Sequence, residues 1–393
     1  MKRDKTPAGL FLLAISLLII NGCGNNDNAA YPVDPVAKSL IVMGDIQVPY
    51  ANISSSRATN RYFANMSSST TNIPQLQQNV ADIAALPQKP DYSFILGDLV
   101  AAEPTTQDKG QTLQSQLNAW IGVFRGFPNG AAINLVPLTG NHEINLIVEP
   151  VPTDPKTWYE TPNSYSYSVW REWTTTNSLF PFTANGPKPT SANPDQLVQD
   201  ESQFSFSFNW GAVHIVVINT DTLSTATDPA TKAPYAGWIP YNWIAADLAA
   251  AQINPKITSI LVMGHRPIEP PAFDSSTDEP TILNQPYPLA NALAALLQQT
   301  PKVKAYFCSH VHAFTAFKLT AAPRVWQVVS GNCGAQPYAN WKLTGVPYFG
   351  FAEVRLHQSG RFSVAAYGRA IPSPYFGSTP LAPAVLKEVI SLE

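Results

Sequence analysis

Short apolar runs that end in polar turns recur five times along the chain. They cover residues 39–43, 92–96, 134–138, 257–263 and 303–308. A short apolar run bounded by turn residues is typical of a buried β-strand. Because ligands of α/β sheets bind at the carboxyl ends of strands, the side chains in these turns are candidates for one shared site. They are Asp45, Gln47, Asp98, Asn141, His142, His265, His310 and His312.

Apolar residues at helical spacing lie between these runs. They predict helices around residues 76–86, 113–124, 243–251, 289–298 and, in the C-terminal tail, 381–392. Period-two alternation at residues 204–208 predicts a half-buried strand, followed by a buried strand at 213–218. Residues 325–329 predict another strand, and residues 348–356 and 361–367 predict a hairpin that turns at Ser359-Gly360.

The pattern breaks down between residues 149 and 200, where proline, threonine, asparagine and aromatic residues dominate. We expect an insertion rather than a linker, because its aromatic side chains need a surface to pack on. Two interpretations stay open: a surface lid that is only partly buried, or a wall that shapes the substrate site. The aromatic residues concerned are Trp158, Tyr159, Tyr165, Tyr167, Trp170 and Trp173.

The N-terminus is typical of a targeting signal. A basic start precedes an apolar stretch at residues 10–20, which is too short for a comfortable membrane span. Ile20-Asn-Gly-Cys23 resembles a bacterial lipobox, which implies cleavage before Cys23 and a lipid on its thiol; the alternative is an ordinary signal peptide. We expect a lipoprotein signal peptide at 1–22, a tether at 23–38 and lipid anchoring to the membrane in the bacterial cell envelope.

Composition narrows the classes of function. The chain has 393 residues, of which 45% are hydrophobic and 13% charged, with a net charge of −3. No dense lysine or arginine patch is visible, so we expect no nucleic-acid-binding surface. After Cys23 only Cys308 and Cys333 remain. This excludes a CxxC-type zinc site and leaves a disulfide between them open. The sequence does not indicate an oligomeric state.

The candidate ligands favour a metal centre. Carboxylate, amide and imidazole groups together suit first-row divalent or trivalent metal ions. Asp98 could bridge two ions, because a carboxylate has two oxygens. Two ions about 3.5–4 Å apart form a clamp for in-line displacement at phosphorus, and they lower the pKa of bound water to about 7.

The order of the motifs resembles the calcineurin-like metallophosphoesterase superfamily. The motifs are Gly44-Asp45-x-Gln47, Gly97-Asp98, Gly140-Asn141-His142-Glu143, Gly264-His265 and Ser309-His310-x-His312. Residues 204–214, Gly264-His-Arg-Pro267 and Phe349-Gly-Phe351 are similar to the purple-acid-phosphatase-like branch, so the resemblance covers about residues 39–367. It implies an α/β fold of the metallo-dependent phosphatase type: a four-layer αββα sandwich with two mixed β-sheets. Residues 368–393 would form a C-terminal tail.

The resemblance also implies an activity, namely hydrolysis of phosphate esters by a metal-bound hydroxide at a dinuclear site. One ion would be bound by Asp45, Gln47, Asp98 and His312, and the other by Asp98, Asn141, His265 and His310. His142 would lie beside the substrate, where it orients the phosphate or protonates the leaving oxygen. Manganese, iron, zinc and magnesium stay open as the ions, and monoesters and diesters as the substrates.

Two departures from the family pattern concern the first ion. Most of the superfamily has histidine where this chain has Gln47, and a neutral amide loosens the ion or favours Mn²⁺ or Mg²⁺ over Zn²⁺. Purple acid phosphatases have tyrosine at the position of Ala101, so we expect no purple colour. Ser309 replaces a glycine, which we take as a minor change.

The remaining polar residues are expected to be structural. We expect His214 and His357 to support the fold, Asp221 to be a turn residue and Glu143 to cap or orient its neighbours. Arg266 fits either a phosphate contact or a structural anchor. The alternative function is a cell-envelope lipoprotein that binds a partner through the aromatic insertion and has a weakened metal site.

Overall fold

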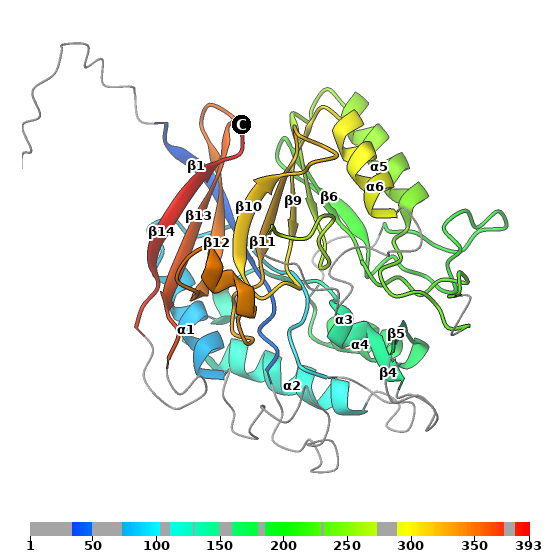
Figure 1. Ribbon diagram of the computed structural model, residues 1–393, viewed down its shortest axis with the longest axis horizontal. Coiled ribbons are helices and arrows are strands. Elements are labelled where there is room, and N and C mark those ends of the chain that lie inside the picture. The colour runs from blue at the N-terminus through cyan, green and yellow to red at the C-terminus, as the bar shows by residue number, and fades with distance from the viewer. Residues whose placement is uncertain are drawn as a thin grey trace, which may run out of the picture. The chain divides into compact units, whose positions relative to one another are not determined.

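Two mixed β-sheets form the centre of the computed structural model (Figure 1). The structure describes residues 34–48, 73–102, 111–128, 130–148, 159–179, 185–228, 232–272, 289–372 and 382–393. The predicted signal peptide and most of the predicted tether lie outside these residues. Within the described part of the chain, no helix is long and apolar enough to cross a membrane.

The first sheet has six strands in the order β14-β13-β12-β1-β2-β3. Its parallel part consists of β1 (Val36–Met43), β2 (Tyr92–Ile95) and β3 (Leu135–Pro137). The antiparallel part consists of β12 (Tyr348–His357), β13 (Phe362–Ala370) and β14 (Val385–Ser391). The expected hairpin between β12 and β13 is confirmed.

The second sheet also has six strands, in the order β10-β11-β9-β8-β7-β6. Its parallel centre consists of β7 (Val213–Val217), β8 (Ser259–Met263), β9 (Val303–Cys308) and β11 (Trp326–Ser330). The antiparallel edges are β6 (Phe206–Trp210) and β10 (Phe314–Lys318).

Helices cover the outer faces of the sheets. On the first sheet these are α1 (Ile73–Ala84) and α2 (Gln111–Gly126), and on the second α5 (Tyr241–Ile253) and α6 (Leu289–Gln299) (Figure 1). The other elements are α3 (Asn141–Ile144), α4 (Ser164–Thr176), the strand pair β4 (Asn145–Val148) and β5 (Tyr159–Pro162), and the 3₁₀ helices η2 (Gly130–Ala132) and η3 (Ala339–Leu343).

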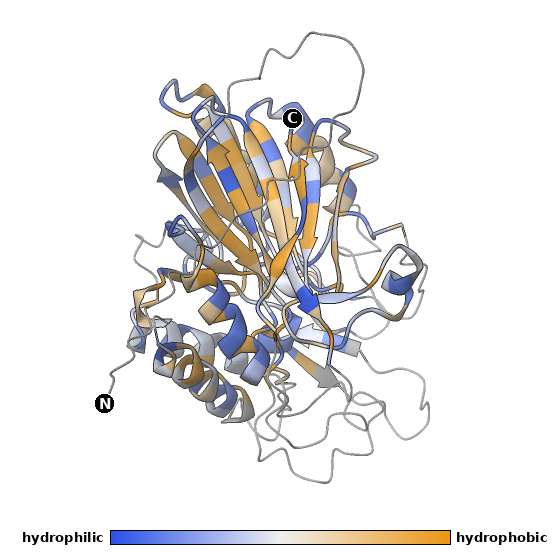
Figure 2. Cartoon of the chain, turned by 90° about the vertical axis from the view of Figure 1, so that its left-hand side faces the viewer, coloured by the Kyte–Doolittle hydropathy of each residue, from blue (hydrophilic) through white to orange (hydrophobic). Residues whose placement is uncertain are grey.

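Alternation along β1 explains why the sheets are covered on both faces. Leu40 and Val42 point into the core that the first sheet shares with the second, whereas Ile41 and Met43 point into a separate core lined by α1 and α2. Successive residues of a strand face opposite sides, so a strand buried on both faces is apolar throughout. Figure 2 shows this apolar character along the strands. The predicted four-layer αββα sandwich is thus confirmed.

One expectation about local structure was wrong. The C-terminal tail is not helical, because residues 385–391 form β14, which pairs antiparallel with β13 across a bulge. Of the region at 149–200, for which two interpretations were left open, the helix α4 packs into the core. Trp170 and Trp173 of α4 are buried with their ring centroids 5.2 Å apart, and Trp173 also lies 6.3 Å from Trp120 of α2.

Candidate metal centre

Strand ends from both sheets meet where the sequence predicts a site. The first sheet supplies Asp45 and Gln47 after β1, Asp98 after β2 and Asn141 after β3. The second sheet supplies His265 after β8 and His310 and His312 after β9. Two groups of side chains have potential ligand atoms that lie within 4.8 Å of one another: Asp98, His265 and His310, and Asp45, Asp98 and His312.

The backbone at these turns adopts an unusual conformation. The φ angles of Asp45, Gln47, Asp98 and His310 are 55°, 47°, 51° and 68°, in the left-handed region that is unfavourable for side chains with a Cβ atom. Such residues cost on the order of 1–3 kcal/mol each and persist where the surrounding structure enforces them, commonly at functional sites. At Gly140 a Cβ atom would lie 2.1 Å from Oδ1 of Asp98, so only glycine allows this close approach.

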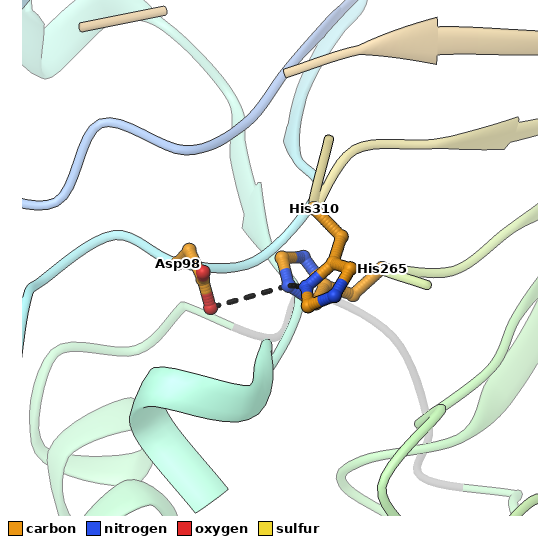
Figure 3. Close-up of side chains that lie close together, drawn as sticks. All are labelled: Asp98, His265 and His310. Atoms are coloured by element: carbon orange, nitrogen blue, oxygen red, sulfur yellow. Dashed lines mark hydrogen bonds and ion pairs between the residues drawn. The ribbon is translucent and has the colours of Figure 1, made fainter. Parts of the chain in front are cut away.

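Asp98, Asn141, His265 and His310 form the first cluster, of which Figure 3 shows Asp98, His265 and His310. Oδ1 of Asn141 lies 2.9 Å from both Nε2 of His265 and Nδ1 of His310. Oδ1 of Asp98 lies 3.2 Å from Nε2 of His265. Nδ1 of His265 faces away from the cluster, 2.8 Å from the carbonyl oxygen of Leu96. In the neutral ring this carbonyl fixes the tautomer that leaves Nε2 free of a proton, as histidine ligands require.

Asp45, Gln47, Asp98 and His312 form the second cluster. Nε2 of His312 lies 3.4 Å from Oδ1 of Asp45 and 3.2 Å from Nε2 of Gln47. The Gln47 amide donates to Oδ2 of Asp98 over 3.2 Å, and a half-turn of this amide would present its oxygen to the same space. Oδ1 of Asp45 is buried with the His312 ring as its ion-pair partner, so both groups are candidate ligands of one cation.

Electrostatics favour the protonation state that a metal ion needs at Asp98 and His310, whereas His265 must lose a proton when an ion binds. Burial raises the pKa of Asp98, but His265 and His142 outweigh it and hold the pKa well below its usual range. Burial and the charge of Arg266 lower the pKa of His310 well below its usual range. Burial lowers the pKa of His265, but the charge of Asp98 and its other partners raise it to about 9 overall. A cation that binds this ring would therefore displace a proton.

Glu143 orients the turns around Asp98, as expected. Its carboxylate accepts hydrogen bonds from the backbone N–H groups of Asp98, Val100 and Gly140 over 2.9, 3.1 and 2.8 Å. Burial, and then the charge of Asp98, raises the pKa of Glu143 to about 7. His142 follows Asn141 on α3, and its Nε2 lies 3.7 Å from Oδ2 of Asp98, with 18% of the side chain exposed.

Arg266 is a buried anchor beside the site. Its Nε donates to both carboxylate oxygens of Asp221 over 3.0 and 2.9 Å, and its Nη2 donates to Glu160 over 2.9 Å. Asp221 is therefore structural, as expected. Glu160 was not predicted, because it lies in the region of 149–200 without a sequence pattern. Its Oε1 accepts a hydrogen bond from the Asn141 amide over 3.2 Å.

Other sequence predictions have clear outcomes. His214 is structural, since its ring lies 2.7 Å from Asn209 and 2.8 Å from Asp247. His357 lies 2.8 Å from the hydroxyl of Ser363, and is likewise structural. Cys308 and Cys333 are both free and buried. Ser309 matters more than expected, because its hydroxyl donates to the Leu96 carbonyl over 2.6 Å and lies 2.9 Å from Nδ1 of His265.

Comparisons with known proteins identify the family and the fold of the chain. The chain matches the calcineurin-like phosphoesterase family over residues 38–314 and therefore belongs to it. A dimetal phosphatase from Danio rerio has a similar structure, with 14% identity, a TM-score of 0.52 and coverage of 85% of this chain and 97% of that chain. PhoD also has a similar structure, with 13% identity, a TM-score of 0.52 and coverage of 93% and 71%. No curated protein matches significantly in sequence.

At these identities the structural likenesses concern the fold, which is that of the metallo-dependent phosphatases. Family membership and the two clusters together define the class of protein: a metal-binding hydrolase of phosphate esters.

Proposed function

We propose that the protein hydrolyses phosphate esters at a dinuclear centre bridged by Asp98. The observation that carries this proposal is that the two oxygens of Asp98 face different clusters. Oδ1 lies beside His265, and Oδ2 accepts from Gln47. One ion would be held by Asp98, Asn141, His265 and His310, and the other by Asp45, Gln47, Asp98 and His312.

The chemistry divides between these ions and the residues around them. Two bound divalent or trivalent ions would activate water for attack on phosphorus and offset the charge of the phosphoryl oxygens. His142 orients the phosphate or protonates the leaving oxygen, which its partial exposure next to Asp98 supports. The neutral Gln47 makes the Asp45 cluster the weaker of the two, so Mn²⁺ or Mg²⁺ suits it better than Zn²⁺.

The setting of this activity is the bacterial cell envelope. The lipobox-like Ile20-Asn-Gly-Cys23 supports a lipid on Cys23, which would keep the enzyme at a membrane surface. Replacing Cys23 by serine should remove radiolabelled fatty acid from the protein and release it from the membrane fraction. Labelling that survives in Cys23→Ser would contradict this assignment. Within the family we assign the chain to the purple-acid-phosphatase-like branch, on residues 204–214 and Gly264-His-Arg-Pro267.

The activity is tested with purified protein, metal analysis and a panel of aryl phosphomonoesters and phosphodiesters. His265→Ala should abolish turnover while the far-ultraviolet circular dichroism spectrum is retained. The matched control is His357→Ala, which removes a histidine of β12 outside the clusters and should leave turnover intact. Folded wild-type protein that retains no metal and hydrolyses no ester with Mn²⁺, Zn²⁺ or iron supplied would instead favour a binding lipoprotein.

A further inference from the structure

The part of the chain without a sequence pattern reaches the first cluster through β5. Glu160 lies on this strand and pairs in register with Ile147 of β4. Its carboxylate receives hydrogen bonds from three side chains. The Asn141 amide donates to Oε1 over 3.2 Å, and the Asn145 amide and Arg266 donate to Oε2 over 3.1 and 2.9 Å.

These contacts decide how the Asn141 amide points. An amide can present either its oxygen or its NH₂ group to a given space, but only the oxygen can bind a cation. With Nδ2 donating to Glu160, Oδ1 faces His265 and His310 at 2.9 Å. The opposite orientation would place Oδ1 against the Glu160 carboxylate and the NH₂ group against the ion. Both contacts are unfavourable.

Glu160 is itself held in place by buried partners. Arg266 is 1% exposed and also binds Asp221, which is 1% exposed. Asn145 bridges Glu160 and Asp221, because its amide also donates to Oδ1 of Asp221 over 3.0 Å. The Glu160 side chain is 20% exposed, but its position is set from the buried side.

We propose that Glu160 is a positioning residue that holds Asn141 in its metal-binding orientation, so that β5 completes the first cluster. This inference rests on the proposed function, since it assumes that Asn141 is a ligand. Partners that orient a metal ligand commonly change metal affinity by about 10–100-fold when they are removed.

Two substitutions separate the contact from the charge. Glu160→Gln keeps the size of the side chain but replaces one acceptor by a donor, which must then face Asn141, Asn145 or Arg266. Glu160→Asp keeps the charge but is one methylene shorter. Both should weaken Mn²⁺ binding at one of two sites by about 10–100-fold, measured by calorimetric titration of metal-free protein. Glu172→Gln, on the exposed face of α4, removes a charge from the same region and should bind Mn²⁺ like the wild type.

A double substitution tests the orientation argument directly. Asn141→Asp supplies an oxygen at both positions, so it no longer needs an orienting partner. In that background the Glu160 carboxylate would repel the new carboxylate oxygen that replaces the Asn141 amide nitrogen, so Glu160→Gln should not weaken Mn²⁺ binding.

The result that overturns the inference is wild-type affinity in Glu160→Gln or Glu160→Asp, or an equal loss in both backgrounds. Wild-type protein that binds no Mn²⁺ would overturn the proposed function as well. If the wild-type protein binds two ions and Glu160→Gln binds them equally tightly, the proposed function stands and only the role of Glu160 is refuted.

Discussion

Glu143 is the strongest single test of how the site is built. It lies on α3, is fully buried and accepts N–H bonds from three turn residues, including the bridging Asp98. Glu143→Ala leaves these three N–H groups buried without an acceptor. Each such group costs about 1–3 kcal/mol, so the free energy of unfolding should fall by about 3–9 kcal/mol. This is comparable with the total stability of about 5–15 kcal/mol of a typical protein.

Glu143→Gln is the milder version of the same change. The amide oxygen can take the place of Oε2 and keep the bonds from Asp98 and Gly140, but the NH₂ group then meets the Val100 N–H. At a pH well above 7, where the Glu143 carboxyl is ionised, one charge-assisted bond is lost, at a cost of about 1.5–3 kcal/mol. We expect the order of stability wild type, Glu143→Gln, Glu143→Ala.

The assay is urea unfolding followed by tryptophan fluorescence, with the exposed Glu172→Gln as a control that should lie within about 0.5 kcal/mol of the wild type. If Glu143→Ala were as stable as the control, the carboxylate would not hold the Asp98 turn, and the reasoning would be refuted.

Three further changes probe the surrounding structure. Burial raises the pKa of Glu201 from 4.5 to about 8. The folded state therefore binds the proton more tightly between these values, and stability is lost as the pH rises through this window. Glu201→Gln should match the wild type in urea unfolding near pH 4.5 and exceed it above pH 8 by up to about 5 kcal/mol; an equal difference at both pH values would contradict the burial of this carboxyl. Trp170→Ala empties a fully buried position of α4 and should lower the free energy of unfolding by about 3–5 kcal/mol, whereas a loss below 1 kcal/mol would mean that α4 is only a surface layer. Ser309→Ala removes one donor to the Leu96 carbonyl but leaves that of His265, so it should cost about 1 kcal/mol in urea unfolding and change turnover less than about threefold; complete loss of turnover would show that Ser309 alone holds the ring.

The sequence was sufficient for the strand ends and for the side chains that meet there, because both are local. Each buried strand is a short apolar run, and the candidate ligand comes within a few residues of its end. The same locality explains the wrong prediction for the tail. Val385, Leu386, Val389 and Ile390 have helical spacing, but an edge strand with a bulge also accommodates it. The preceding strand β13 supplies the pairing that decides between helix and strand.

Two features of the 149–200 region differ in how far they could have been foreseen. The helix α4 left a signal, since Tyr167, Trp170 and Trp173 repeat every three residues after Asn163, whose side chain caps the helix. Glu160 left none. Its role depends on the strand pair β4–β5 and on Arg266, more than a hundred residues later, and no local pattern encodes such contacts.

The central claim is that two ions bind per chain and that hydrolysis needs both. The most direct measurement is the rate of aryl phosphate hydrolysis by metal-free protein as Mn²⁺ is added in known ratios to the chain. We predict no turnover without metal and a rate that rises until two ions are bound per chain. Full activity in the metal-free protein, or a plateau at one ion, would contradict the account.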